Sequence, residues 1–382
     1  MIEVMKVAFN ARTLSAPQLR GWSRYSSNLI RELSLAGVKV YLFSDRKLNE
    51  ELLKGCSKDN VEVVVKSGLL YIDWEQRVLA SLCKEYQIDI LHCPINYGLP
   101  IYRNWKQVLT LHDAIEKAFY DPHKSFFEKI SFDHLYVRAL HRLAQNSSDK
   151  IITVSKHAAL DIEKFYGVSS NKIEVIYEAA DPIFTKEPMF SKEDLKKKFN
   201  LSEDYLFYVG GFEKRKNIEF LLEALSKTKK NSLLAIAGGG AEINELRSLS
   251  IKMGISHRVK LLGWVEDQFL PSLYHYARAL VYPSFYEGFG LQIVEAMAQS
   301  CPVLCSNQTS LPEVWGSELG TFDPCDREGL SSLLDKVVED EQFYQGLKAW
   351  SCKRHQNFSW KKTAQETIKV YESLLSQSET SL

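Results

Sequence analysis

Short apolar runs rich in β-branched residues alternate with longer amphipathic segments along most of this chain. One series of runs covers residues 7–9, 38–43, 61–65, 88–91, 108–111 and 151–154, and a second covers 205–209, 233–237, 259–262, 279–282 and 302–305. Such alternation is typical of strands joined by helices around a parallel sheet. Two separate series in a chain of 382 residues therefore predict two α/β domains of similar size.

The stretch between the two series contains two prolines. Pro182 and Pro188 prevent one continuous helix there, so we place the domain boundary between residues 183 and 184. The predicted domains are residues 1–183 and 184–360. The tail has apolar residues at helical spacing, among them Tyr371 and Leu374. We expect a last helix over about 361–382 that packs back on the first domain.

Charge and cysteine content restrict the partners of the chain. Basic and acidic residues number 48 each, so no overall field favours nucleic acid. The seven cysteines show neither a disulfide-like nor a zinc-like spacing, and no Asp-x-Asp triplet is present, so we expect a reducing compartment and no metal site. No signal peptide or membrane-spanning segment is recognisable. These features predict a cytoplasmic protein.

The most specific pattern follows the predicted strand 279–282, in the order Glu287-Gly288-Phe289-Gly290-Leu291 and then Glu295. Two glycines at the start of a helix let the backbone come close to a ligand, and the helix end attracts phosphate. The two carboxylates can accept hydrogen bonds from vicinal hydroxyls. The pattern lacks the third glycine of a dinucleotide fingerprint, because Ile293 stands there, so a nicotinamide dehydrogenase is disfavoured.

Three further candidates lie just after predicted strands or near the N-terminus. Arg215 and Lys216 follow the first strand of the second domain, where two cations could neutralise a diphosphate. His112 follows an apolar strand, and Gly21 can approach a phosphate without a side chain in the way. Taken alone, such a basic run is more often a solvated surface, and a single histidine such as His112 is usually a structural hydrogen-bonding group.

The whole pattern resembles the retaining glycosyltransferases of family 4. Residues 282–298 resemble the Glu-x7-Glu motif of that family, and 208–217 resemble its phosphate-binding loop. The family's donor-contacting loop, His-Asp loop and closing helix are similar to residues 21–25, 111–113 and 358–360. The resemblance implies a GT-B fold, in which two Rossmann-like domains with parallel sheets face each other across a cleft.

The resemblance also implies roles for individual residues. By position in the motifs, the catalytic residues are His112 and Glu287. The donor-binding residues are Gly21, Arg215, Lys216, Glu287, Gly288, Phe289, Gly290, Leu291 and Glu295. Two positions depart from the family pattern, because Gly211 stands where many members carry an arginine and Ser23 replaces a second glycine. Whether Arg215 takes over from the missing arginine is open.

A function follows from these matches as an expectation. The chain would move a mannose- or glucose-type hexose from GDP-mannose or a UDP-hexose to a glycan or lipid-linked acceptor in polysaccharide biosynthesis, with retention and without metal or other cofactor. Two alternatives stay open, a sugar-nucleotide epimerase and a catalytically silent protein that binds nucleotide sugars. The departures at Gly211 and Ser23 are the reason that the silent protein stays open.

One segment of the first domain bears on membrane contact. Aromatic and aliphatic residues from Phe126 to Val137 are interspersed with basic ones such as Lys124, Lys129 and Arg138. The segment could be a membrane-facing amphipathic surface or a core helix, and the core helix is the simpler interpretation. Beyond the cytoplasmic location, a peripheral contact with the inner face of a membrane stays open as the alternative.

Overall fold

The chain folds into two compact units in the computed structural model, which describes residues 5–15, 21–119, 141–201, 204–240 and 242–379. The first unit comprises Met1–Glu178 and Trp360–Leu382, and the second comprises Ala179–Ser359. The second unit is thus continuous in sequence, whereas the first is assembled from both ends of the chain. The amphipathic segment around Phe126 lies outside the described residues.

The first unit is built on a seven-stranded parallel sheet with the order β3-β2-β1-β4-β5-β6-β7. The direction in which the chain adds strands reverses between β1 and β4. The strand β4 is buried throughout, as expected for a parallel strand covered on both faces, whereas the edge strand β3 leaves Val63 and Val65 exposed. The strands are β1 (Lys6–Asn10), β2 (Lys39–Ser44), β3 (Val61–Val65), β4 (Ile90–Cys93), β5 (Lys106–Thr110), β6 (Lys150–Thr153) and β7 (Ile173–Val175).

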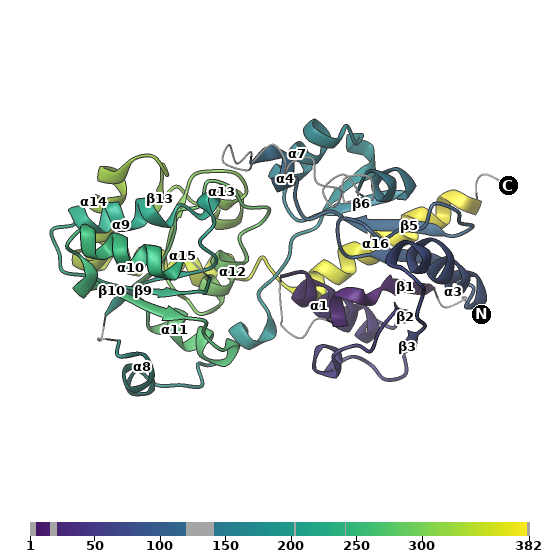
Figure 1. Cartoon of the computed structure of the whole chain (residues 1–382), viewed down its shortest axis with the longest axis horizontal. Coiled ribbons are helices and arrows are strands. Elements are labelled where there is room, and N and C mark those ends of the chain that lie inside the picture. Colours follow the sequence, from purple (N-terminus) through teal and green to yellow (C-terminus); the bar gives the residue numbers. More distant parts are fainter. Residues whose placement is uncertain (1–4, 16–20, 120–140, 202–203, 241, 380–382) are drawn as a thin grey trace. The chain divides into compact units, whose positions relative to one another are not determined.

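Two long helices from distant parts of the sequence pack together in the first unit (Figure 1). The helix α16 (Trp360–Glu379) buries Tyr371 and Leu374, and it contacts α1 (Gly21–Leu35), which buries Tyr25 and Leu29. The shorter helices of the unit are α2 (Tyr71–Asp73), α3 (Leu79–Glu85), α4 (Ile115–Ala118) and α7 (Lys156–Tyr166).

The second unit repeats this architecture on a six-stranded parallel sheet with the order β10-β9-β8-β11-β12-β13. Its reversal point lies between β8 and β11. Both sheets therefore share the strand order of dinucleotide-binding folds, in which ligands bind where the order reverses. The strands are β8 (Tyr205–Val209), β9 (Leu233–Ala237), β10 (Val259–Gly263), β11 (Ala279–Tyr282), β12 (Val303–Ser306) and β13 (Thr321–Phe322).

Helices cover the second sheet, with α9 packed on α14 and α12 packed on α15. The helices of this unit are α8 (Lys192–Phe199), α9 (Ile218–Lys227), α10 (Ile243–Lys252), α11 (Leu270–Tyr276), α12 (Leu291–Ala298), α13 (Leu311–Trp315), α14 (Arg327–Glu339) and α15 (Glu341–His355). Two parallel sheets covered by helices confirm the predicted α/β class. Every apolar run named above lies in or overlaps a strand, whereas the short edge strands β7 and β13 were not predicted.

The predicted boundary at residues 183 and 184 falls inside a segment that is fixed to the second unit. Asp181 caps a short 3-10 turn, Pro182–Thr185, by accepting a hydrogen bond of 3.1 Å from the backbone N–H of Ile183. Phe184 is fully buried and meets the ring of Tyr274 edge to face. The amide of Gln299 donates to the carbonyl of Phe184 at 2.6 Å. The chain passes from one unit to the other before this turn, at Glu178.

We expect Phe184→Ala to destabilise the second unit by about 3–5 kcal/mol, because it leaves a cavity beside Tyr274. Ile183→Ala is the matched control, since Ile183 is only partly buried in the same turn. Calorimetric unfolding of the two variants measures the difference. If both variants unfold like the wild type, the turn is not part of the core of the second unit.

Candidate functional site

Two loops of the second unit leave the sheet at its reversal point. The strands β8 and β11 pair directly, and both are parallel, so the loops that follow them start at the same edge of the sheet. The loop after β8 contains Arg215 and Lys216, and the loop after β11 contains Glu287. Open α/β sheets bind their ligands between the two loops that leave the sheet at such a reversal point.

The loop after β11 ends in a turn that requires glycine. Gly290 precedes α12 with a φ of +107°, and a Cβ atom there would lie 2.8 Å from Cδ2 of Leu311. A side chain at this position would therefore be strained both by the backbone and by its neighbour. The glycine lets the backbone turn directly from the Glu287 loop into α12.

Lys216 and Glu287 form a buried ion pair. The Nζ atom of Lys216 lies 2.7 Å from Oε1 of Glu287 and 2.7 Å from the hydroxyl of Tyr282, the last residue of β11. Lys216 is 5% exposed and Glu287 is 7% exposed, so both charges are almost removed from bulk water. Tyr282 in turn donates to the side-chain oxygen of Gln292 at 2.9 Å. An ammonium group, a carboxylate and a phenol thus form one connected group.

Arg215 completes this group as a second cation. Its Nη1 atom lies 3.0 Å from Oε2 of Glu287 and 3.3 Å from the carbonyl oxygen of Tyr286. The backbone carbonyl of Arg215 accepts a hydrogen bond of 2.7 Å from the N–H of Phe285. The two oxygens of one carboxylate are therefore divided between two cations from the neighbouring loop.

The ionised states of Glu287, Lys216 and Arg215 stabilise one another. Burial alone would raise the pKa of the Glu287 carboxyl, but Lys216 and Arg215 outweigh burial and lower that pKa below its ordinary value. Burial is also the largest influence on Lys216 and lowers its pKa, an effect that Glu287 opposes. The carboxylate is thus ionised at neutral pH and its two partners carry the compensating positive charge.

Side chains from a third loop hold the backbone around Glu287. The N–H of Glu287 donates to the hydroxyl of Thr309 at 3.1 Å. The hydroxyl of Ser310 contacts the carbonyl oxygens of Glu287 and Phe289, each at 2.9 Å. Asn217, between the basic turn and α9, donates to the carbonyl of Pro324 at 2.9 Å. Thr309 and Ser310 were not predicted as site residues, because a hydroxyl that binds backbone leaves no motif. Asn217 ends the predicted phosphate-binding loop but was not singled out as a site residue.

The second carboxylate of the motif has a different partner. Glu295 lies in α12, is 7% exposed, and accepts a hydrogen bond of 2.8 Å from the hydroxyl of Tyr274 in α11. Tyr274 is fully buried. Phe289 is buried and packs edge to face on Phe358. Leu291 begins α12, and Gly288, which precedes Phe289, is partly exposed. The proposed donor-binding roles of these residues remain predictions.

The glycine that replaces the expected arginine has a structural contact. The carbonyl oxygen of Gly211 accepts a hydrogen bond of 2.6 Å from the hydroxyl of Tyr208 in β8. No side chain extends from this position, and the arginine that contacts Glu287, beside Lys216, is Arg215. This placement is compatible with a transfer of the arginine role to Arg215.

His112 lies in the first unit, after β5, and both of its ring nitrogens have protein partners. Nδ1 lies 3.0 Å from Oε1 of Glu178, and Nε2 lies 3.1 Å from the carbonyl oxygen of Pro94. Burial alone would lower the pKa of His112, but the hydrogen bond and the charge of Glu178 outweigh it and raise that pKa. Glu178 follows the unpredicted strand β7 and was missed for that reason.

Aromatic residues of α1 lie beside His112. Tyr25 meets its ring edge to face at 4.8 Å between centroids, and the partly exposed Trp22 lies at 6.5 Å. Gly21 is the first residue of α1, and among the described residues no atom beyond its chain neighbours and its own helix backbone lies within 4 Å of the position that a Cβ atom would take. His112 and Gly21 are therefore placed on neighbouring elements of one unit.

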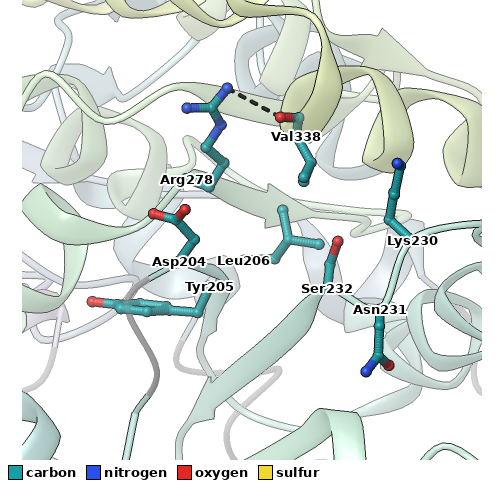
Figure 2. A pocket seen from close by; sticks show the side chains of 8 residues that line it. All are labelled: Asp204, Tyr205, Leu206, Lys230, Asn231, Ser232, Arg278 and Val338. Carbon is teal, nitrogen blue, oxygen red and sulfur yellow. Dashed lines mark hydrogen bonds between the residues drawn. The ribbon is translucent and has the colours of Figure 1, made fainter.

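A pocket of about 240 Å³ lies elsewhere in the second unit and is drawn in Figure 2. Its lining includes the residues at which β8 begins and those just before β9 and β11, so it lies at the opposite edge of the sheet from Glu287. Its cations have partners already: Arg278 donates to the carbonyl oxygens of Val337 and Val338, and Lys230 pairs with Glu339 at 2.6 Å. The pocket does not offer the chemistry of a donor site.

Metal-binding clusters and membrane-spanning helices are both lacking in the part of the chain that the structure describes. Across the described ranges, no three or more His, Cys, Asp or Glu side chains are grouped so that they could hold a metal ion. Within the same residues, none of the helices combines the length and the apolar character needed to cross a membrane.

Comparison with known proteins identifies the family. The model described as glycosyltransferase family 4 matches residues 19–183, and the model described as glycosyl transferases group 1 matches residues 190–353. The O-antigen chain mannosyltransferase B of Escherichia coli is 29% identical over 390 residues, which cover 97% of this chain and 100% of that protein. The serotype-specific mannosyltransferase WbdA of Escherichia coli is 30% identical over 289 residues, covering 72% of this chain but only 34% of WbdA.

Solved structures share the fold over nearly the full chain. Sucrose-phosphate synthase from Thermosynechococcus elongatus has a TM-score of 0.76 at 20% identity and covers 98% of this chain and 100% of its own. HepE from Anabaena in complex with UDP-glucose has a TM-score of 0.73 at 18% identity, with 97% and 100% covered. The shared architecture is that of GT-B glycosyltransferases, as predicted. The chain belongs to the glycosyl transferases group 1 family.

Proposed function

We propose that the protein is a retaining hexosyltransferase that moves a mannose- or glucose-type sugar from a nucleotide-diphosphate sugar to a glycan or lipid-linked acceptor. The observation that carries this proposal is the contact of Lys216 and Arg215 with Glu287 at the reversal point of the second sheet. Two cations can neutralise a departing diphosphate, and a carboxylate can accept hydrogen bonds from sugar hydroxyls.

In the proposed reaction the acceptor attacks the anomeric carbon from the face that the nucleoside diphosphate leaves. The bond from the anomeric carbon to the donor phosphate oxygen breaks, the bond to the acceptor oxygen forms, and the acceptor proton passes to the departing diphosphate. Lys216 and Arg215 stabilise the negative charge that develops on this diphosphate. The positive charge comes from side chains in this scheme, so the reaction is proposed to need no metal or other cofactor.

The relatives support two donors. The two Escherichia coli relatives are named as mannosyltransferases, which supports GDP-mannose, and the HepE structure contains UDP-glucose, which supports a UDP-hexose. The names of the relatives also support an acceptor in O-antigen polysaccharide synthesis. We extend the proposal to a cytoplasmic location with peripheral contact at the inner face of a membrane.

A nucleotide and nucleotide-sugar panel tests the donor. A ligand that binds only the folded protein at about 100 times its Kd adds roughly 2.7 kcal/mol of stability, which raises the unfolding temperature measurably. GDP-mannose and the UDP-hexoses are expected to give the largest shifts. The stabilising donor is then incubated with and without acceptor glycans, and the released nucleoside diphosphate and the anomeric configuration of the product are measured, with and without a metal chelator.

Each outcome of this assay separates the proposal from its alternatives. Transfer with a retained anomeric configuration in the presence of chelator supports the proposal in full. Isomerised sugar nucleotide without an acceptor would identify an epimerase. Binding with neither transfer nor hydrolysis would identify a catalytically silent protein, to which the glycine at position 211 already gives some support.

A further inference from the structure

The pairing of His112 restricts its state of protonation. A backbone carbonyl oxygen accepts hydrogen bonds and cannot donate them, so Nε2 of His112, at 3.1 Å from the carbonyl of Pro94, must carry a hydrogen. An ionised carboxylate also only accepts, so Nδ1, at 3.0 Å from Glu178, must carry one as well. An imidazole with hydrogens on both nitrogens is a cation.

The surroundings of this pair isolate it from water. His112 is 6% exposed and Glu178 is 4% exposed. A charge buried to this extent is stable only when it has a partner, and each of these two groups supplies the partner of the other. The backbone N–H of His112 also donates to the side-chain oxygen of Asn96 at 3.3 Å, which fixes the position of the residue as well as its ring.

The other ionisable groups near His112 do not supply an alternative partner. Asp113 is the next residue in the chain, and its negative charge raises the pKa of His112 less than Glu178 does. His92 in β4 is fully buried between Thr110 and Tyr371, and burial lowers its pKa to about 3, so it is neutral. Tyr25 in α1 contacts the ring edge to face, and burial raises the pKa of its phenol, so it is also neutral. Glu178 is the only carboxylate among these groups that contacts a ring nitrogen of His112.

We propose that Glu178 is a positioning residue that holds His112 as a doubly protonated cation, so that His112 serves the site as a fixed positive charge and not as a general base. This inference rests on the proposed function only in assigning His112 a role in the transfer reaction. A neutral histidine at the same place could take a proton from an acceptor hydroxyl. A cation with both nitrogens bound to protein acceptors cannot do so without first losing one of its own protons.

The protonation state can be measured without substrate. In the full-length protein labelled with ¹⁵N-histidine, nitrogen spectra recorded between pH 5.5 and 9 report both ring nitrogens of each histidine. We expect both nitrogens of His112 to carry hydrogens at pH 7 and to titrate above the ordinary value of about 6.5. His92 is an internal reference, because it is expected to stay neutral throughout.

Glu178→Gln is the decisive variant, because glutamine keeps an acceptor oxygen and removes the charge. We expect it to lower the titration midpoint of His112 by about one pH unit or more. Asp113→Asn is the matched control, since it also removes one neighbouring negative charge, and a smaller shift is expected. An unchanged midpoint in Glu178→Gln, or a wild-type His112 with only one protonated nitrogen at pH 7, overturns the proposal.

Stability and activity provide two further measurements. The folded-state pKa of His112 is raised, so its stabilising contribution is complete below about pH 6.5 and is lost as the pH rises through the folded-state pKa. The difference in unfolding temperature between the wild type and Glu178→Gln should therefore shrink as the pH rises.

Transfer by Glu178→Gln should fall between pH 6 and 8 while the wild-type rate stays level. If His112→Ala transfers normally, the proposed role of His112 in the transfer reaction fails, but the nitrogen spectra still decide its protonation.

Discussion

Replacement of Lys216 by methionine is expected to lower glycosyl transfer about a hundredfold, which corresponds to roughly 2.7 kcal/mol of transition-state stabilisation. Methionine preserves much of the side-chain volume but removes the ammonium group that contacts Glu287 and Tyr282. The proposed leaving diphosphate then lacks one of its two cations. The measurement is the rate of nucleoside diphosphate release from the donor that the binding panel identifies.

Lys214→Met is the control for this prediction. Lys214 belongs to the same basic turn as Lys216 but is exposed, so its replacement is expected to leave transfer within about twofold of the wild type. The Lys216 variant is also expected to be less stable, because the buried carboxylate of Glu287 loses one of the two cations with which it forms ion pairs. Donor affinity should therefore be measured at a temperature at which both variants are folded. Equal transfer rates in the two variants would remove Lys216 from the site.

Glu287→Gln is expected to lower transfer by at least about tenfold, or roughly 1.4 kcal/mol of transition-state stabilisation. Glutamine has nearly the same shape, but it leaves Lys216 and Arg215 without the negative charge that they share. It also presents an amide to one of the two cations, where the wild type presents a carboxylate oxygen. The two cations are then expected to be held less firmly, and sugar hydroxyls are expected to bind more weakly.

The pH dependence of stability gives an independent test of the Glu287 charge. Because the pKa of Glu287 is lowered in the folded state, its contribution is present above an unfolded pKa of about 4.3 and is lost as the pH falls through the folded pKa. Glu287→Gln should therefore be less stable than the wild type at pH 7, and the difference should shrink in acid. Glu213→Gln, which removes an exposed carboxylate from the neighbouring loop, should change neither transfer nor this profile. Wild-type stability of Glu287→Gln at pH 7 would contradict the buried ion pair.

The sequence predicted the fold where strands are long and buried, and it failed where they are short. Strands such as β8 and β11 appear as apolar runs because both of their faces are covered. The edge strand β7 contains only Ile173, Glu174 and Val175, all partly exposed, and β13 contains only two residues. Segments this short have no recognisable period, and they are strands only because a neighbouring strand offers hydrogen bonds.

The same limit decided which parts of the site could be predicted. Lys216 and Glu287 are far apart in sequence, but both follow predicted strands, so their common location could be anticipated from parallel topology. Glu178 follows the unrecognised strand β7, and its contact with His112 was therefore not foreseen. The contact between Tyr274 and Glu295 depends on how α11 packs on α12, which no local pattern specifies.

The return of α16 to the first unit has a consequence for biosynthesis. Domains generally fold as units while the chain emerges from the ribosome. The second unit, Ala179–Ser359, is available in full before translation ends, whereas the first unit lacks the partner of α1 until Trp360–Glu379 has been made. The unit that is started first is thus completed last. During synthesis the side of α1 that α16 later covers therefore stays uncovered until the last helix has been made.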